Sequence, residues 1–290
     1  MRGRGGLVAI AAVLLFAGIG IAAWLGGGSS AKPHRTAQRT STTASQGVVT
    51  LHVIFPEGFT RAEMADRIGA VRSIAIKRRH VRPRLTSTGY LAASVAAKAP
   101  TGFKRNPGSR SLEGFLFPAT YDFTQTTAAR ELVADQVAAF RKAFSTVNLR
   151  YAHSKNLTSY DVLTIASMIE KEAVVPAERR LIAAVIYNRL HAQMPLGIDA
   201  TIRYGLRIPG TESLTKTELA SSSAYNTRRF RGLPPTPIAN PGLPSIRAAA
   251  HPARVDYLYF VRKPDKRHHF FTASGAEFLR KACEYGFGCS

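Results

Sequence analysis

The sequence predicts an α+β protein that begins with a transmembrane helix. Three observations indicate this class. An apolar segment at residues 7–25 is long enough to cross a bilayer. Runs rich in β-branched and aromatic residues, near residue 50 and after residue 255, predict short strands. Between these runs, apolar residues recur at helical spacings of three and four. Beyond the first segments about 240 residues remain, enough for one large domain or two small ones.

The amino-terminal segment, residues 7–25, contains no charged residue. About 20 apolar residues span a bilayer as a helix. A cleaved signal peptide is the alternative, but its apolar core runs only about 7–15 residues. We therefore predict an uncleaved single-pass anchor in the cell membrane, preceded by a short tail at residues 1–6. Residues 26–47, rich in Gly, Ser and Thr, predict a flexible linker. Basic residues flank the span on both sides, so charge alone leaves its orientation open.

The charge of the chain is strongly basic, with 40 Lys and Arg against 18 Asp and Glu. A net charge of +22 favours anionic partners such as nucleic acid, anionic lipid or an acidic wall polymer. Part of the excess lies near Lys77, Arg78 and Arg79, which an ordinary solvated surface would also explain. We expect no nucleic-acid partner, because the chain has no groove-reading motif and no aromatic residues interleaved with the basic ones.

A Pro-, Gly- and Ser-rich break at residues 100–111 predicts a domain boundary. Residues 48–110 then form a small basic α/β module, and residues 111–290 form a larger domain. In the module, the β-branched run at residues 48–55 predicts a strand. Thr60, with Glu63 three residues later, predicts the capped start of a helix.

In the larger domain, a helix is predicted from Ala128 to Phe144. Thr158 and Asp161 predict the start of another helix, which Pro176 ends. A further helix then runs to about Ala192. The later elements are predicted loops at residues 194–205 and 224–242, a short helix at residues 245–250, strands at residues 256–261 and 268–272, and a short terminal helix.

The helix after Thr158 carries the residue best suited to act as a proton donor. Its apolar stripe includes Glu172, whereas Glu170 lies about 200° round the helix. A carboxyl on a core-facing stripe is costly when ionised, so its pKa is expected to rise and make it a proton donor near neutral pH. An ion pair with a buried arginine would explain equally well why Glu172 lies on the apolar stripe. The stripe consists of Val162, Ile165, Met168, Ile169, Glu172 and Val175.

Other chemistries have little support in the sequence. It contains no Walker-type glycine loop, no H-E-x-x-H metal motif and no G-x-S-x-G nucleophile elbow. We expect no metal and no organic cofactor. Cys283 and Cys289 are the two cysteines, and their spacing leaves open a small disulfide ring or two free thiols.

Several motifs, taken together and in order, resemble the YceG-like (MltG) family of endolytic murein transglycosylases. They cover nearly all of residues 112–272. The signature helix corresponds to ASMIEKEA at residues 166–173. The other matching segments are LEGFLFPATY (112–121), AVIYNRL (184–190), MPLGIDATIRYG (194–205), AYNTRRFRGLPPTPIANPG (224–242), AAAHPARVDYLYFV (248–261) and HHFFT (268–272).

The resemblance implies a single catalytic acid/base at Glu172 and leaves open whether Glu170 assists it. It also implies a substrate-contacting set, for which a purely structural role in loop turns is the alternative. That set consists of Asn188, Asp199, Tyr225 and Asn226. The family departs from this chain at four motif positions, where the chain has Ala119, Gly197, Ala200 and Glu277.

The resemblance further implies a lysozyme-like helical core and a shortened LysM-like module. It also implies the topology: a cytoplasmic tail at residues 1–6, one membrane span and an extracytoplasmic catalytic domain. The expected reaction is cleavage of the bond between N-acetylmuramic acid and N-acetylglucosamine in nascent peptidoglycan, which leaves 1,6-anhydro ends and stops strand growth. Peptidoglycan strands, the cell membrane and peptidoglycan synthases are the expected partners. The alternatives are an inactive wall-binding or scaffold protein and a muramidase that uses water.

Overall fold

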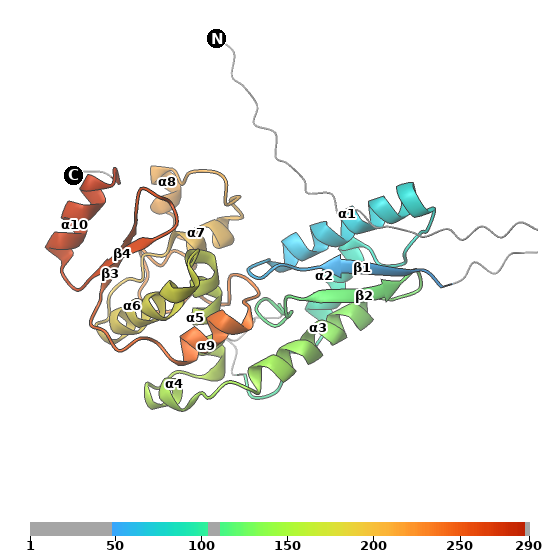
Figure 1. The fold of residues 1–290 in the computed structure, drawn as a ribbon, viewed down its shortest axis with the longest axis horizontal. Coiled ribbons are helices and arrows are strands. Elements are labelled where there is room, and N and C mark those ends of the chain that lie inside the picture. Colours follow the sequence, from blue (N-terminus) through green and yellow to red (C-terminus); the bar gives the residue numbers. More distant parts are fainter. Residues whose placement is uncertain (1–47, 104–110, 288–290) are drawn as a thin grey trace, which may run out of the picture. The chain divides into compact units, whose positions relative to one another are not determined.

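The computed structural model describes residues 48–103 and 111–287, and residues 47–290 form one compact unit (Figure 1). The predicted tail, anchor and linker lie outside the described residues. Within the described part, no helix has the length and apolar character needed to cross a membrane. Helices and strands are mixed along the chain, so the α+β expectation is confirmed.

The first group of elements surrounds a two-stranded antiparallel sheet. Strand β1 (Thr50–Ile54) pairs with β2 (Thr120–Thr124), so that Thr50 lies opposite Thr124. Alternate side chains of β1 are buried, as the pleat of a strand requires. The predicted boundary after residue 110 falls inside this compact unit, and the strand pair crosses it.

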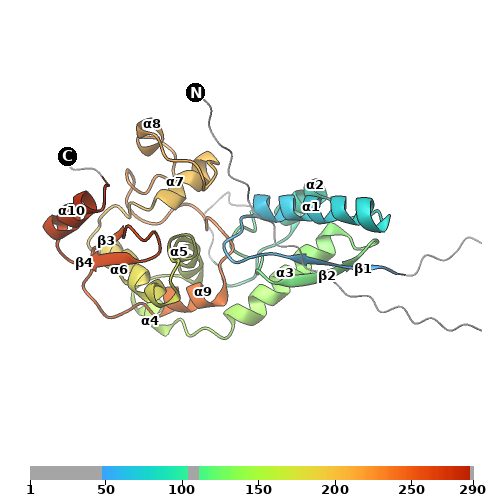
Figure 2. The same ribbon diagram turned by 45° about the horizontal axis from the view of Figure 1, so that its top comes forward.

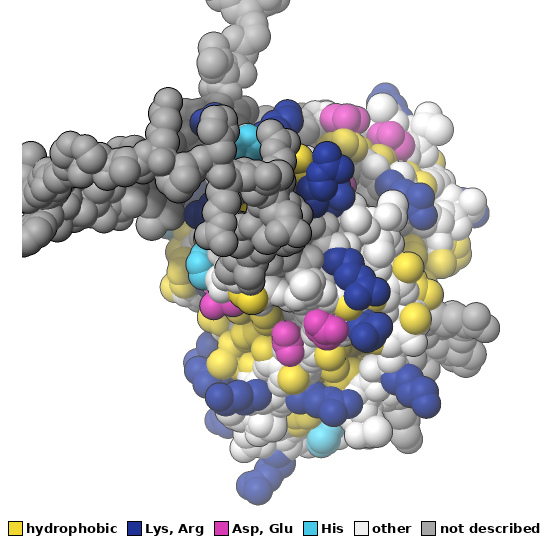
Figure 3. Space-filling model, turned by 90° about the vertical axis from the view of Figure 1, so that its right-hand side faces the viewer, with side chains coloured by type: hydrophobic (Ala, Val, Ile, Leu, Met, Phe, Trp, Pro, Cys, Tyr) yellow, Lys and Arg dark blue, Asp and Glu magenta, His cyan; other side chains and the backbone are white. Residues whose placement is uncertain are grey.

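Three helices accompany this sheet: α1 (Arg61–Arg79), α2 (Ser87–Ala96) and α3 (Ala129–Phe144). Helix α1 packs on α2, and α2 packs on α3 (Figure 2). The predicted start of α1 is confirmed, because Thr60 and Glu63 form a reciprocal capping box. The exposed face of these elements is basic: Figure 3 shows Lys and Arg side chains spread across it, with hydrophobic and a few acidic side chains between them.

Helix α5 (Ser159–Glu172) is the centre of the second group. It packs against α6 (Arg179–His191) and α9 (Leu243–Ala250). Its start is fixed as predicted, since Thr158 caps the helix and Asp161 bonds back to the cap. Residues Val162–Ile169 are buried without exception, so α5 is surrounded on every side instead of presenting one apolar stripe. The short helix α4 (Arg150–Ser154) lies between α3 and α5, and the 3-10 turn at Pro176–Glu178 connects α5 to α6.

The remaining elements are α7 (Asp199–Leu206), α8 (Lys216–Leu219), β3 (Tyr259–Arg262), β4 (His269–Thr272) and α10 (Gly275–Glu284). The two strands predicted in this region are confirmed as β3 and β4, and they pair antiparallel. The prediction of a loop at residues 194–205 was wrong, because α7 occupies its second half. No side chain caps the start of this helix, and its buried Thr201 and Ile202 hold it through tertiary packing.

Candidate active site

Glu172 is the last residue of α5, and its side chain is partly buried. Within the described part of the chain, its carboxyl group takes part in no hydrogen bond and no ion pair. Burial raises its pKa to about 7; the charge of Arg262 opposes this rise, and the charge of Asp199 adds to it. A carboxyl group with this pKa is partly protonated at neutral pH, as a general acid must be.

Three arginines from separate elements act electrostatically on Glu172. Arg262 ends β3, Arg228 lies in the loop after α8, and Arg203 lies in α7. Asp199 is the acidic member of this group and pairs with Arg228 at 2.6 Å between Oδ1 and Nε. The structure therefore brings Asp199 into the surroundings of Glu172, although the two are 27 residues apart in sequence.

Glu170 differs sharply from Glu172, although it is only two residues away. Its side chain is 7% exposed and accepts a hydrogen bond from the backbone N–H of Gly242, at the start of α9, at 3.0 Å. The guanidinium of Arg179 lies 3.8 Å from its other oxygen. An anion at a helix start is stabilised by the helix dipole and its free N–H groups. These contacts give Glu170 a structural role in joining α5 to α9.

Asn188 lies on α6 and uses its side-chain amide to hold a loop. Its Nδ2 donates to the carbonyl oxygens of Val255 and Tyr257, both at 2.9 Å. The neighbouring Arg189 donates to Leu258 O at 2.6 Å. Both contacts fix the segment that leads into β3, the strand that ends in Arg262. A contact between Asn188 and substrate stays a prediction.

Tyr225 and Asn226 shape the loop that carries Arg228. Asn226 is fully buried, donates to the carbonyl oxygens of Leu219 and Ser221, and accepts from the backbone N–H of Arg228. The Tyr225 hydroxyl lies 2.8 Å from the Thr236 hydroxyl. The structure thus gives Asn226 a positioning role for Arg228, which itself pairs with Asp199. Direct contact of Tyr225 or Asn226 with substrate stays a prediction.

A second buried carboxyl group, Glu113, was not identified from the sequence. It accepts hydrogen bonds from the Arg61 backbone N–H, Asn240 Nδ2 and the Tyr204 hydroxyl, at 2.8 to 3.2 Å. Burial raises its pKa to about 7, against the opposing charge of Arg61. Its partners lie at the start of α1, in α7 and before α9. Glu113 therefore links the first group of elements to those around Glu172. The LEGF motif at residues 112–115 was the available signal.

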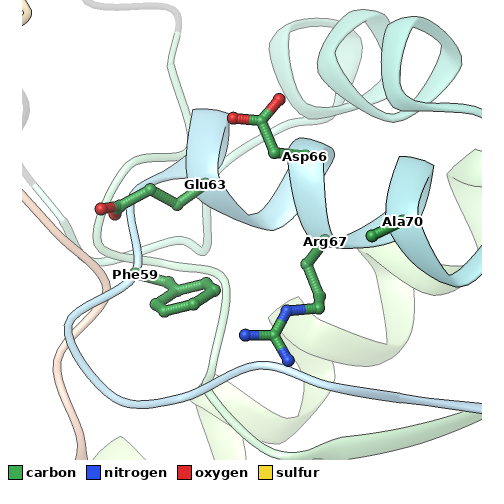
Figure 4. Close-up of a pocket in the computed structure, with 5 residues that line it drawn as sticks. All are labelled: Phe59, Glu63, Asp66, Arg67 and Ala70. Atoms are coloured by element: carbon green, nitrogen blue, oxygen red, sulfur yellow. The ribbon is translucent and has the colours of Figure 1, made fainter. Parts of the chain in front are cut away.

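A shallow pocket of about 320 Å³ lies on the side of α1, and it contains none of the predicted site residues. Phe59, Glu63, Asp66, Arg67 and Ala70 line it. Figure 4 shows the Arg67 guanidinium directed toward the Phe59 ring, and the two groups lie 5.3 Å apart. The Glu63 carboxylate is already bound to the Thr60 N–H. These interactions stabilise the start of α1 and give no reactive arrangement.

The sequence model of the YceG-like family matches residues 29–284. The chain belongs to the YceG-like family. It is 32% identical over 267 residues to an endolytic murein transglycosylase of Streptococcus pneumoniae (strain ATCC BAA-255 / R6), a match covering 86% of this chain and 47% of that protein. It is 40% identical over 153 residues to an endolytic murein transglycosylase of Bacillus subtilis (strain 168), covering 52% and 42% of the two proteins. The chain spans less than half the length of these relatives.

A crystal structure of a YceG-like protein from Listeria monocytogenes has a similar fold. The TM-score is 0.65 at 30% sequence identity, and the match covers 78% of this chain and 74% of that one. Membership of the YceG-like family, expected from the motifs between residues 112 and 272, is therefore confirmed.

Proposed function

We propose that this YceG-like protein is a lytic transglycosylase that cleaves peptidoglycan glycan strands internally, with Glu172 as its acid/base. The observation that carries the proposal is the Glu172 carboxyl group: it is partly buried, free of hydrogen bonds within the described part and raised in pKa to about 7. Relatives named endolytic murein transglycosylases supply the substrate class.

The proposed reaction begins with protonated Glu172. Its proton passes to the oxygen that joins N-acetylmuramic acid to N-acetylglucosamine, and the bond from that oxygen to C1 of the muramic sugar breaks. Positive charge develops at C1. The Glu172 carboxylate then accepts the proton of the C6 hydroxyl of the same sugar, and the C6 oxygen bonds to C1. The products are a 1,6-anhydro end and a free N-acetylglucosamine 4-hydroxyl, and Glu172 is again protonated.

The surrounding residues have supporting roles in this proposal. Asp199 and Arg228 form an ion pair beside Glu172, and Asn226 fixes the backbone of Arg228. Asn188 supports the segment before Arg262. We assign substrate contact to Asp199 and to Tyr225, whose side chains are partly exposed, and positioning to Asn188 and Asn226. Glu170 serves to join α5 to α9 and does not assist the proton transfer.

A muramidase reaction is the second candidate, and Asp199 is the observation that favours it. Hydrolysis requires a second carboxylate that activates water or attacks C1. Asp199 is close enough to raise the pKa of Glu172, so such a group is present in the site. Its pairing with Arg228 at 2.6 Å favours a binding role and the lytic route.

We also propose how the chain is divided between membrane, linker and catalytic part. We place residues 7–25 as a single-pass anchor in the cell membrane, residues 26–47 as a linker and the catalytic part outside the cytoplasm. The central α5, surrounded by α6 and α9, is consistent with a lysozyme-like core. The elements before residue 111 are consistent with a shortened LysM-like module. Peptidoglycan synthases that make the nascent strands are the proposed partners.

The test is an analysis of product ends. The compact unit, residues 47–290, is incubated with uncrosslinked glycan strands, and the products are identified by mass spectrometry. We expect 1,6-anhydromuramic ends from the parent. Removal of a general acid lowers rates by about 10²–10⁴-fold, so Glu172→Gln should give almost no product. Glu170→Gln is the matched control, because it keeps an oxygen for the Gly242 N–H and should retain the anhydro products.

The other outcomes are equally informative. Reducing ends that disappear in Asp199→Asn would establish the muramidase. Equal cleavage by the parent and by Glu172→Gln would refute the assignment of Glu172. An absence of cleavage by a folded parent protein would favour a wall-binding or scaffold function.

A further inference from the structure

One stretch of sequence in the first group of elements carries a concentration of positive charge and no acidic residue. No Asp or Glu occurs between residues 67 and 112. Five basic side chains in this stretch lie close together in the chain and are all exposed. We call them the basic end: Lys77, Arg78, Arg79, Arg82 and Arg84. Within the described residues, none of the five is paired with a carboxylate.

The fold directs these side chains outward. Lys77, Arg78 and Arg79 form the last turn of α1, where bases complement the helix dipole. After the helix, Val81, Pro83 and Leu85 are buried, so the alternating Arg82 and Arg84 face solvent. Arg72 Nε holds this segment by donating to Pro83 O at 3.2 Å. The helix dipole accounts for the first three bases but not for Arg82 and Arg84.

The basic end adjoins the point at which the chain enters the compact unit. Arg84 N–H donates to Gln125 O at 2.8 Å, and Val49 N–H donates to Gln125 Oε1 at 3.0 Å. Gln125 thus contacts both the basic segment and Val49, the residue directly before β1. The anchor predicted at residues 7–25 precedes this point by the 22 residues numbered 26–47. A flexible linker of that length has a root-mean-square span of about 26 Å.

Two exposed apolar side chains accompany the bases. Ile74 is 60% exposed and lies one helical turn before Arg78, on the same face of α1. Val48, next to Val49, is 75% exposed. Figure 3 views the molecule from this side and shows hydrophobic side chains among the Lys and Arg. Apolar side chains beside bases suit an interface with anionic lipid, where headgroup charge and acyl chains lie together.

We propose that the basic end binds anionic phospholipid headgroups at the membrane surface and so fixes the orientation of the catalytic unit. The inference rests on the proposed anchor, which keeps the unit within reach of the bilayer. A linker alone leaves the unit free to rotate. Contact at the basic end fixes one side against the membrane, and the distance of Glu172 from the bilayer then follows from the fold.

The experiment measures binding of residues 47–290 to sedimented vesicles and is independent of glycan cleavage. Vesicles of phosphatidylcholine alone are compared with vesicles that also contain phosphatidylglycerol.

Each base near an anionic surface is expected to contribute about fivefold in affinity. The triple variant Arg78→Gln, Arg79→Gln, Arg82→Gln should therefore bind about a hundredfold more weakly. The matched control is Arg141→Gln, Lys142→Gln, Arg150→Gln, which removes the same charge from exposed positions near the end of α3. Circular dichroism confirms folding of each variant.

We expect binding only to the phosphatidylglycerol vesicles, weakened by salt and by Ile74→Ser, and retained in the control variant. Equal loss in both triple variants would overturn the proposal, since net charge would then suffice. Failure of the parent to bind vesicles would also overturn it, and binding to soluble polyglycerol phosphate in that case would assign the surface to a wall polymer. Glycan cleavage by the same preparation separates either failure from failure of the proposed activity.

Discussion

Glu170 and Glu172 show how position decides the chemistry of one residue type. Both belong to α5; the Glu170 side chain is 7% exposed, and Glu172 is partly buried. Glu170 has a backbone N–H and an arginine as partners. Glu172 has neither within the described part of the chain, and burial raises its pKa to about 7. Glu170 therefore makes structural contacts between α5 and α9, whereas Glu172, two residues later, is the proposed proton donor.

The pH dependence of cleavage should report the ionisation of Glu172. Its acid form starts the reaction, so kcat/KM should be level below pH 7 and fall about tenfold per pH unit above it. Arg262 holds this pKa down, so Arg262→Gln should move the falling limb to higher pH. The measurement is kcat/KM against pH for both proteins. An unmoved limb would show that another group controls the profile.

At the scale of elements, α5 depends on a local signal at its start and on neighbours along its length. Thr158 and Asp161 cap the helix through contacts that the sequence specifies. The packing of α6 and α9 against it comes from distant segments. Removal of the cap should therefore lower the stability of the protein without changing the reaction that it catalyses.

Thr158→Ala should lower the free energy of unfolding by about 1 kcal/mol, because the Asp161 N–H loses its acceptor. Thr158→Ser keeps the hydroxyl and should remain near the parent value. Urea unfolding measures both variants. Since Thr158 lies at the opposite end of α5 from Glu172, product ends should be unchanged; a change of product type would contradict a purely structural cap.

The contact through Glu113 joins elements far apart in the sequence. Glu113→Ala would leave the Arg61 N–H and the Tyr204 hydroxyl without this acceptor in a buried site. We expect a loss of about 3 kcal/mol in unfolding free energy, because buried groups without partners are costly. Glu113→Gln retains an accepting oxygen and should lose less. Similar unfolding curves for the parent and Glu113→Ala would show that the network contributes little.

For the whole molecule, one continuous core includes buried residues from Leu51 to Ala250. Strand β2 completes the sheet of the first group, and Phe115 contacts both Phe140 and Tyr160. The two predicted parts on either side of residue 110 therefore share buried contacts within the compact unit.

A shared core should make unfolding of residues 47–290 a single transition. In differential scanning calorimetry, the calorimetric and van't Hoff enthalpies should agree. Two separate transitions would show that the first group of elements folds independently of the part around Glu172.

The local features of this protein could be predicted from its sequence. Capping residues located the starts of α1 and α5, and a β-branched run located β1. Ordered motifs identified the YceG-like family and predicted Glu172 as its acid/base. The helix caps and the strand depend on residues close together in the chain. The family motifs are specific enough to be recognised without a structure.

Other features depend on contacts between residues far apart in the chain and could not be predicted. Helix α7 lacks a side-chain cap and forms against a buried surface, which is why its segment was predicted as a loop. Glu170 is buried by contacts with α9 and Arg179 that periodicity does not contain. The arginines around Glu172, at positions 203, 228 and 262, come together only when α7, a loop and β3 meet. The pKa of the proposed catalytic acid depends on burial and on these charges, and both are properties of the folded chain.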